Sequence, residues 1–278
     1  MRTGWAIAIP FLTGTALLEA QQGDAVRPLL RTAVEQYLRN SSSLQEFRFV
    51  RRVARAELDA TGKQKTWTAA TSKVDFEDGV RATWLVARDD RPLAADELRK
   101  EEEEARRAAR EWRDKSPLER KEIEEKKEKR ARLERALLGE LPEALVFRSR
   151  APEIRAGRTT LVYDFEPRPG YSPKSREAQV YTGAKGTIWI DRDDGQLVRL
   201  KAETFRDVSM GLFLASVSQG SRIEVNQTRL ESGAWVPLNQ SVHYAARIVF
   251  RNVRRQVETQ YRDFQPYEGP VWRSTGAY

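Results

Sequence analysis

The sequence predicts an α+β fold in which a curved antiparallel sheet wraps around one N-terminal helix. Three observations predict it: side chains alternate between apolar and polar in many segments, Gly-containing turns separate these segments, and one amphipathic helix precedes them. The clearest example is residues 186–200, where Ile188 and Ile190 occupy alternate positions before an Asp-Asp-Gly turn and the alternation resumes after it. A period of two on both sides of such a turn is typical of a β-hairpin.

A short helix is expected over residues 28–38, beginning at Pro28, because proline is tolerated in the first turn of a helix. Asn40 and the three serines after it are expected to end the helix. Its apolar side chains recur at helical spacing and form one stripe, which consists of Leu30, Val34, Tyr37 and Leu38. This stripe needs a surface to pack against.

Three strands are expected next, at residues 44–59, 64–76 and 80–87, joined by turns at residues 59–62 and at Asp78-Gly79. Further strands are expected around Leu161 to Phe165 and at residues 221–231, 235–248 and 250–267. Most of them carry apolar side chains on one face and charged side chains on the other, which is typical of an antiparallel sheet with one wet face. A twisted sheet of this size must curl, and the apolar helix is the expected filling.

A charged helical hairpin is expected between these two groups of strands, as an insertion over residues 92–140. Of the 39 residues from 97 to 135, 28 are charged, so no strand is expected there. Ser116 and Glu119 flank Pro117 in a capping box, which predicts that a second helix begins at this point. We favour a solvated spacer for this insertion, and a docking arm is the alternative.

The N-terminus has the pattern of a secretory signal peptide over residues 1–20. Arg2 precedes an apolar run from residue 5 to residue 18, and Ala20 offers a small residue before a cut at Gln21. The alternative is an uncleaved anchor, but 14 residues of helix span only about 21 Å of a hydrocarbon core roughly 30 Å thick. We therefore expect one domain over residues 21–278, in the periplasm or secreted.

The amino-acid composition limits the kinds of partner and chemistry that we expect for this protein. The chain has no cysteine, which excludes disulfides, thiolate metal sites and cysteine nucleophiles. Its formal net charge is +8, but an exported chain rarely meets nucleic acid, so we expect no nucleic-acid partner. An anionic membrane surface or an acidic envelope protein would suit this charge, and solubility alone is an equally good explanation.

Several motifs together resemble the LolA/LolB-like superfamily of outer-membrane lipoprotein-sorting proteins, in an uncharacterised bacterial branch. They are the stretch around Trp189 and Gly195 in residues 186–200, the turn at residues 57–63, the passage from Arg88 to Leu93, and the Gly-Ala-Trp-Val-Pro strand at residues 233–237. The closing strand would contain residues 261–264. The resemblance implies a half-barrel around a helix, with an apolar cavity that shelters acyl chains. The charged helical hairpin is foreign to the carriers of this superfamily.

No motif predicts catalysis. His243 is the single histidine and lies in a strand without a nucleophile motif near it. The acidic turn at Asp191, Asp193 and Asp194 fails the EF-hand spacing, since Gly195 comes fifth and Ala202 occupies position 12. We expect no enzyme, no catalytic residue, no bound metal and no cofactor.

A hydrophobic ligand is the remaining expectation. The candidate cavity side chains are aromatic residues expected to point inward: Phe47, Phe49, Tyr163, Phe165, Trp189, Trp235, Tyr244 and Phe250. The alternative is that the same side chains fill a packed core. Two functions follow: a carrier or sensor of lipid or lipoprotein acyl chains, and alternatively a non-enzymatic envelope scaffold that docks through its basic surface and helical hairpin.

Overall fold

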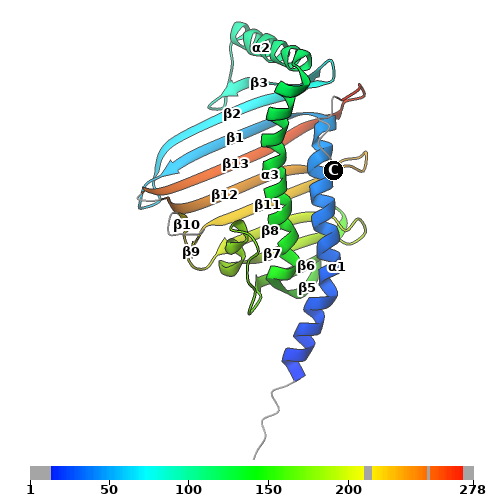
Figure 1. The fold of residues 1–278 in the computed structure, drawn as a ribbon, viewed down its shortest axis with the longest axis vertical. Coiled ribbons are helices and arrows are strands. Elements are labelled where there is room, and N and C mark those ends of the chain that lie inside the picture. Colours follow the sequence, from blue (N-terminus) through cyan, green and yellow to red (C-terminus); the bar gives the residue numbers. More distant parts are fainter. Residues whose placement is uncertain (1–13, 210–214, 249–250, 272–278) are drawn as a thin grey trace, which may run out of the picture.

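The computed structural model describes residues 14–209, 215–248 and 251–271, and shows one large antiparallel sheet with helices beside it. The strand order is β4-β3-β2-β1-β13-β12-β11-β8-β7-β6-β5, with the short strands β9 and β10 attached beside β12 (Figure 1). The sheet is open, since β4 and β5 stand at its two edges. The first and last long strands pair with each other in its centre. The predicted α+β class, a curved antiparallel sheet with a helix against it, is confirmed.

The strands before the insertion are β1 (Phe47–Leu58), β2 (Gln64–Glu77), β3 (Val80–Arg88) and β4 (Arg91–Pro92). Those after it are β5 (Leu145–Arg155), β6 (Arg158–Pro167), β7 (Ala184–Asp191), β8 (Leu197–Thr204), β9 (Val208–Ser209), β10 (Ala215–Val217), β11 (Arg222–Arg229), β12 (Trp235–Ile248) and β13 (Arg251–Pro266). Short 3₁₀ turns, η1 (Leu44–Glu46) and η2 (Glu177–Gly183), complete the list. The predicted long strands are confirmed to within a few residues at either end.

Helix α1 (Gly14–Ser43) is longer than predicted in both directions. The expectation that Pro28 begins it was wrong, because Pro28 lies inside the helix, with its ring on an exposed side. The helix also continues past Asn40, whose side-chain amide donates to Oε1 of Gln196 at 2.7 Å. A sheet contact thus holds the polar end of the helix that local propensity would have ended earlier.

Helices α2 (Ala95–Asp114) and α3 (Pro117–Ala144) form the insertion (Figure 1). The capping box of Ser116 and Glu119 is present at the start of α3, as predicted. The two helices have separate neighbours: α2 packs on β3 and β2, whereas the close contacts of α3 are with α1, η2 and β5. They are therefore not a free hairpin, because α2 buries Ala109 against β3 and the end of α3 buries Leu141 in the core beside α1.

Helix α2 packs on the opposite face of the sheet from α1. Its residue Ala109 joins Val80, Ala82 and Trp84 of β3 in a small buried cluster. Arg106 reinforces the contact, with Nη1 2.8 Å from Glu77 and its guanidinium 5.2 Å from the centre of the Trp84 ring. Glu77 alternates with Phe76 along β2, so α2 lies on the face that Phe76 does not occupy.

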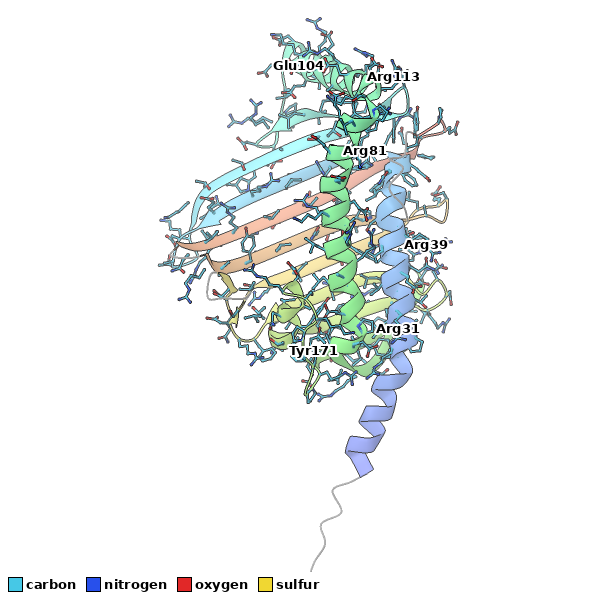
Figure 2. The ribbon with its side chains drawn as sticks, viewed as in Figure 1. Arg31, Arg39, Arg81, Glu104, Arg113 and Tyr171 are labelled. Atoms are coloured by element: carbon cyan, nitrogen blue, oxygen red, sulfur yellow. The ribbon has the colours of Figure 1, made fainter. Side chains whose placement is uncertain are left out.

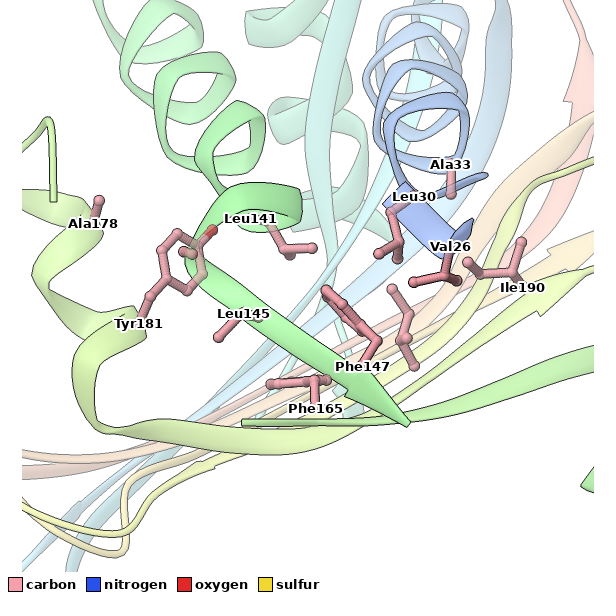
Figure 3. Close-up of a cluster of buried hydrophobic side chains, with 12 residues drawn as sticks. Val26, Leu30, Ala33, Leu141, Leu145, Phe147, Phe165, Ala178, Tyr181 and Ile190 are labelled. Carbon is pink, nitrogen blue, oxygen red and sulfur yellow. The ribbon is translucent and has the colours of Figure 1, made fainter. Parts of the chain in front are cut away.

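The main core lies where α1 and the end of α3 meet strands β5 to β8 (Figure 3). Leu30 of α1 and Leu145 and Ile190 of the sheet are fully buried within it. Among the described helices, none has both the length and the apolar character needed to cross a bilayer.

Candidate ligand-binding face

The register of the strands assigns every side chain to one of two faces. The helix-bearing face is the face against which α1 packs. It carries Phe49 of β1 and Ile188 of β7, which belong to its two apolar clusters. The opposite face carries their strand neighbours, such as Arg48 and Trp189, because successive side chains in a strand point to opposite sides.

A continuous apolar row crosses the helix-bearing face. Each member is the direct cross-strand partner of the next, from β5 through β6, β7, β8, β11 and β12 to β13. We call the apolar row the set Phe147, Phe165, Gly186, Ala202, Ile223, Val242 and Val257. A second line beside it adds Ile188, Leu200 and Val225. Directly opposed residues in a sheet lie about 5 Å apart, so the row presents an unbroken apolar strip.

One end of the apolar row is a packed core. Phe147 and Phe165 are buried, with their ring centres 6.1 Å apart, and Leu30 of α1 and Leu145 belong to the same cluster (Figure 3). Gly186 has no side chain to lift the Phe165 ring off the sheet, since a Cβ there would lie 2.7 Å from Cζ of Phe165. The side chains named at this end pack against one another.

The other end of the apolar row is half-buried. Ile223, Val242 and Val257 keep part of their surface accessible. Helix α1 makes close contacts with β5, β8 and β12. The strand that α3 contacts closely is β5. Figure 1 shows both helices crossing one end of the long strands and leaving the other end without a helix over it. The row therefore passes from a filled core onto an accessible apolar surface.

An aromatic cluster lies on the same face, where β1 meets β13. The Phe49 ring centre is 5.5 Å from that of Phe264 and 5.8 Å from that of Tyr261, and Phe47 meets Phe264 edge to face at 6.2 Å. Such tilted arrangements suit the charge distribution of aromatic rings. Burial raises the pKa of Tyr261 above its ordinary value.

The structure brings four of the predicted cavity aromatics onto the helix-bearing face in two separate clusters. Phe47 and Phe49 belong to the aromatic cluster, and Tyr163 and Phe165 belong to the core under α1. Tyr244 lies on the same face of β12, two residues beyond Val242, and is opposite Arg255. Phe250 lies outside the described residues.

Trp189 lies on the opposite face from these rings. It is sandwiched between Arg155 and Arg199, whose guanidinium carbons are 5.1 and 5.0 Å from its centre, and its indole N–H donates to Glu153. Trp235 lies at the start of β12, where its indole N–H donates to Asp194 at 2.9 Å. A role for either residue in contacting a ligand remains a prediction.

The acidic turn of residues 191–195 is held by hydrogen bonds. Arg158 donates from Nε and Nη2 to the two carboxylate oxygens of Asp191 at 2.6 and 2.7 Å. The backbone N–H groups of Asp193 and Asp194 donate to the same carboxylate. Burial alone would raise the pKa of Asp191, but these bonds outweigh it and hold the pKa below its ordinary value. These hydrogen bonds therefore fix the turn between β7 and β8 to Arg158 of β6.

A groove of about 640 Å³ lies on the opposite face, over β6, β7, β8, β11 and β12. His243 and Ser241 line it, together with many charged side chains that pair with one another. Glu203 lies 3.3 Å from Lys185 and 3.7 Å from Arg222, for example, and Glu224 lies 3.6 Å from Lys201. Because opposite charges alternate along it, the groove carries little net field to select an ion.

Sequence reasoning missed the polar contacts that position the helices over the sheet. Gln196 is fully buried between Asn40 of α1 and Gln227 of β11, and it donates to Gln227 at 3.0 Å. Glu140 of α3 is buried and accepts from Tyr171 and Ser175 at 2.5 and 2.8 Å. Each contact joins residues far apart in the chain, so no local pattern signals it.

Similar folds occur among solved structures, at low sequence identity. A domain described as an outer membrane lipoprotein-sorting protein from Vibrio parahaemolyticus is 10% identical, covers 87% of this chain and 95% of its own, and has a TM-score of 0.32. A DUF1329 family protein from Desulfovibrio piger is 10% identical over 88% of this chain and 94% of its own, with a TM-score of 0.29. A LolA superfamily protein from Nitrosomonas europaea is 8% identical over 86% of this chain and 95% of its own, with a TM-score of 0.28.

No protein-family model matches the sequence, and no curated protein matches it. Each of the solved structures described above has a TM-score of 0.32 or less. Because the similarity is remote in each case, function is inferred below from the side chains of this chain.

Proposed function

We propose that this protein is an exported cell-envelope protein that binds a hydrophobic ligand, such as the acyl chain of a lipid or lipoprotein, along the apolar row. The observation that supports the proposal is the passage of this row from a packed core onto an accessible surface at Ile223, Val242 and Val257. A soluble domain rarely leaves a contiguous apolar strip accessible without a partner for it.

An acyl chain fits such a strip for a physical reason. A saturated chain is narrow and apolar along its whole length, and removing each methylene from water contributes about 0.8 kcal/mol. The apolar row supplies an aliphatic side chain from each of β8, β11, β12 and β13, namely Ala202, Ile223, Val242 and Val257. Binding and release of the chain require no reaction, so the proposal is for a non-enzymatic carrier or sensor, with a place in lipoprotein sorting.

Export through the signal peptide of residues 1–20 belongs to the same proposal. Helix α1 begins at Gly14 and runs across the proposed cut after Ala20. The described side-chain contacts of α1 begin at Val26, and those of Leu30 and Ala33 follow, so the cut would leave the helix anchored in the core. N-terminal sequencing of the protein recovered from a periplasmic extract would test the cut, and a sequence beginning before Gln21 would contradict it.

Ligand binding is tested by introducing glutamate at each of two adjacent positions of β12. Val242→Glu places a carboxylate on the apolar row, whereas Ser241→Glu places one on the opposite face of the same strand. Titration of a fluorescent palmitate analogue into each protein gives its affinity, and circular dichroism checks that both variants are folded. We expect at least a tenfold weaker affinity for V242E and an affinity near that of the wild type for S241E.

Native mass spectrometry of the protein purified from the periplasm provides the second measurement. We expect a co-purified lipid on the wild-type chain and less of it on V242E. A wild-type protein without bound lipid that also fails to take up the palmitate analogue would overturn the proposal. Equal losses in the two folded variants would show that the apolar row is not the binding surface.

A further inference from the structure

Two arginines lie together on the helix-bearing face, beside the aromatic cluster. Arg51 of β1 is directly opposite Tyr261 of β13. Arg81 of β3, labelled in Figure 2, lies with its guanidinium carbon 5.5 Å from the centre of the Phe49 ring. Phe49 precedes Arg51 by two residues in β1, so its ring and the Arg51 side chain stand next to each other on one face.

Among the described residues, neither of these two arginines forms an ion pair with a carboxylate, unlike their neighbours Arg48 and Arg52. Arg48 and Arg52 occupy the other face of β1, and each pairs with an aspartate, Asp75 at 2.6 Å and Asp90 at 2.7 Å. Arg51 instead has a buried Nε without a hydrogen-bond acceptor in the described part of the chain. The arginines on one face of β1 are thus paired with aspartates, whereas Arg51 on the other face is not, within the described residues.

Arg81 is the more exposed member of the pair, and Arg51 is partly buried. Its Nη2 donates to the backbone oxygen of Leu44 at 2.5 Å, which leaves its other donors for a further acceptor. Partial desolvation of its guanidinium lowers the pKa of Arg81, and the positive charge of Arg51 lowers it further. Two like charges side by side raise each other's free energy unless an anion lies between them.

The arginine pair lies on the same face as the accessible part of the apolar row, within the length of an acyl chain from it. Tyr261, opposite Arg51, and Val257 of the row lie on the same face of β13, four residues apart. A strand rises about 3.3 Å per residue, so the two positions are separated by roughly 13 Å. The surface between them belongs to the same face, with Thr259 and Val53 as a cross-strand pair.

We propose that Arg51 and Arg81 bind the phosphate of an anionic amphiphile whose hydrocarbon chain lies along the apolar row. This inference rests on the proposed function and names the ligand class as a lipid with a phosphate head group. Guanidinium groups bind phosphate oxygens through paired, charge-assisted hydrogen bonds, and the phosphate would accept from the Nε of Arg51. The aromatic cluster would limit water around that contact.

The test compares three probes that separate the head group from the chain: hexadecyl phosphate, hexadecanol and inorganic phosphate. Each is titrated as a competitor of the fluorescent palmitate analogue, against wild type, Arg51→Gln and Arg48→Gln. Arg48→Gln is the matched control, because it removes the same charge from the other face of β1. Arg81 is left intact, because its bond to Leu44 also supports the η1 turn.

We expect wild type and R48Q to bind hexadecyl phosphate about 10- to 100-fold more tightly than hexadecanol, as charged hydrogen bonds of ordinary strength would give. R51Q should lose this preference and keep its affinity for hexadecanol. Equal affinities for the two chains in wild type, or an unchanged preference in R51Q, would overturn the head-group site while leaving chain binding intact. Competition by inorganic phosphate at the same concentrations as hexadecyl phosphate would assign the site to a free anion and overturn the lipid assignment. Binding of neither chain would mean that the proposed function itself has failed.

Discussion

Gly186 lies under the ring of Phe165, its cross-strand partner on the helix-bearing face. A Cβ atom at position 186 would lie 1.9 Å from the backbone oxygen of Lys201 and 2.9 Å from Cα of Ala202, besides meeting the Phe165 ring. Backbone atoms cannot move aside as a flexible side chain can. The glycine is thus what allows β6, β7 and β8 to pack tightly where the apolar row enters the core.

Substitution of Gly186 by alanine should therefore destabilise the fold. We expect G186A to lower the free energy of unfolding by about 1–3 kcal/mol or more, as overpacking of a core does. Gly139 is the control, because it lies in α3 with no atom within 4 Å of a Cβ built on it. G139A should raise stability by roughly 0.5–1 kcal/mol, since alanine favours a helix over glycine. Urea unfolding measures both, and a loss in G139A equal to that in G186A would contradict the steric explanation.

The ion pair of Arg158 and Asp191 should be the main support of the acidic turn. The Asp191 side chain is 1% exposed, and Asp191→Asn would remove the charge that Arg158 and two backbone N–H groups share. We expect D191N to lower the free energy of unfolding by about 1–3 kcal/mol. Asp193→Asn is its control, because Asp193 is 59% exposed and lies 3.9 Å from Arg158. D193N should change stability by less than about 0.5 kcal/mol, and a similar loss in both variants would argue against a specific role for Asp191.

Glu140 should contribute stability that depends on pH. Burial would raise its pKa, but hydrogen bonds from Tyr171, the backbone of Lys174 and Ser175 outweigh burial and lower it. A carboxylate with a lowered pKa in the folded state stabilises the fold above its unfolded pKa of about 4.3, and this contribution is lost as the pH falls through the folded pKa. Urea midpoints should therefore fall more between pH 7 and pH 3 in wild type than in Glu140→Gln. Parallel declines in the two proteins would contradict this assignment.

The strands were predictable from the sequence because their signals are local. Alternation fixes the period, and Asp78-Gly79 and Gly233 adopt the positive φ angles that their turns require, so the boundaries of β3 and β12 follow closely. The faces were less predictable. Alternation separates Trp189 from Ile188 but does not say which of two apolar side chains meets the helix. Whether Ile188 or Trp189 enters the core under α1, and which of them packs between two arginines, depends on where α1 lies.

The full extent of α1 and the arginine pair were not predictable, because both depend on contacts between residues far apart in the sequence. Asn40 meets Gln196 across 156 positions of sequence, and Arg81 meets Leu44 across 37. Such contacts extend α1 beyond the residues that favour a helix locally. They also bring Arg51 and Arg81 together from two strands that are not adjacent in the sheet.

The packing of α2 on β3 should depend on one small residue. Ala109 is 4% exposed between the helix and the strand, whereas the adjacent Ala108 is exposed on α2. Ala109→Glu would bury a carboxylate against Val80 and Ala82, so we expect α2 to detach and trypsin to cleave within residues 95–114 at least tenfold faster. Ala108→Glu, the matched control, should keep the wild-type cleavage rate. Equal resistance of the two variants would mean that the ion pairs of Arg106 and Arg113 with Glu77 and Asp78, and not apolar packing, hold the helix.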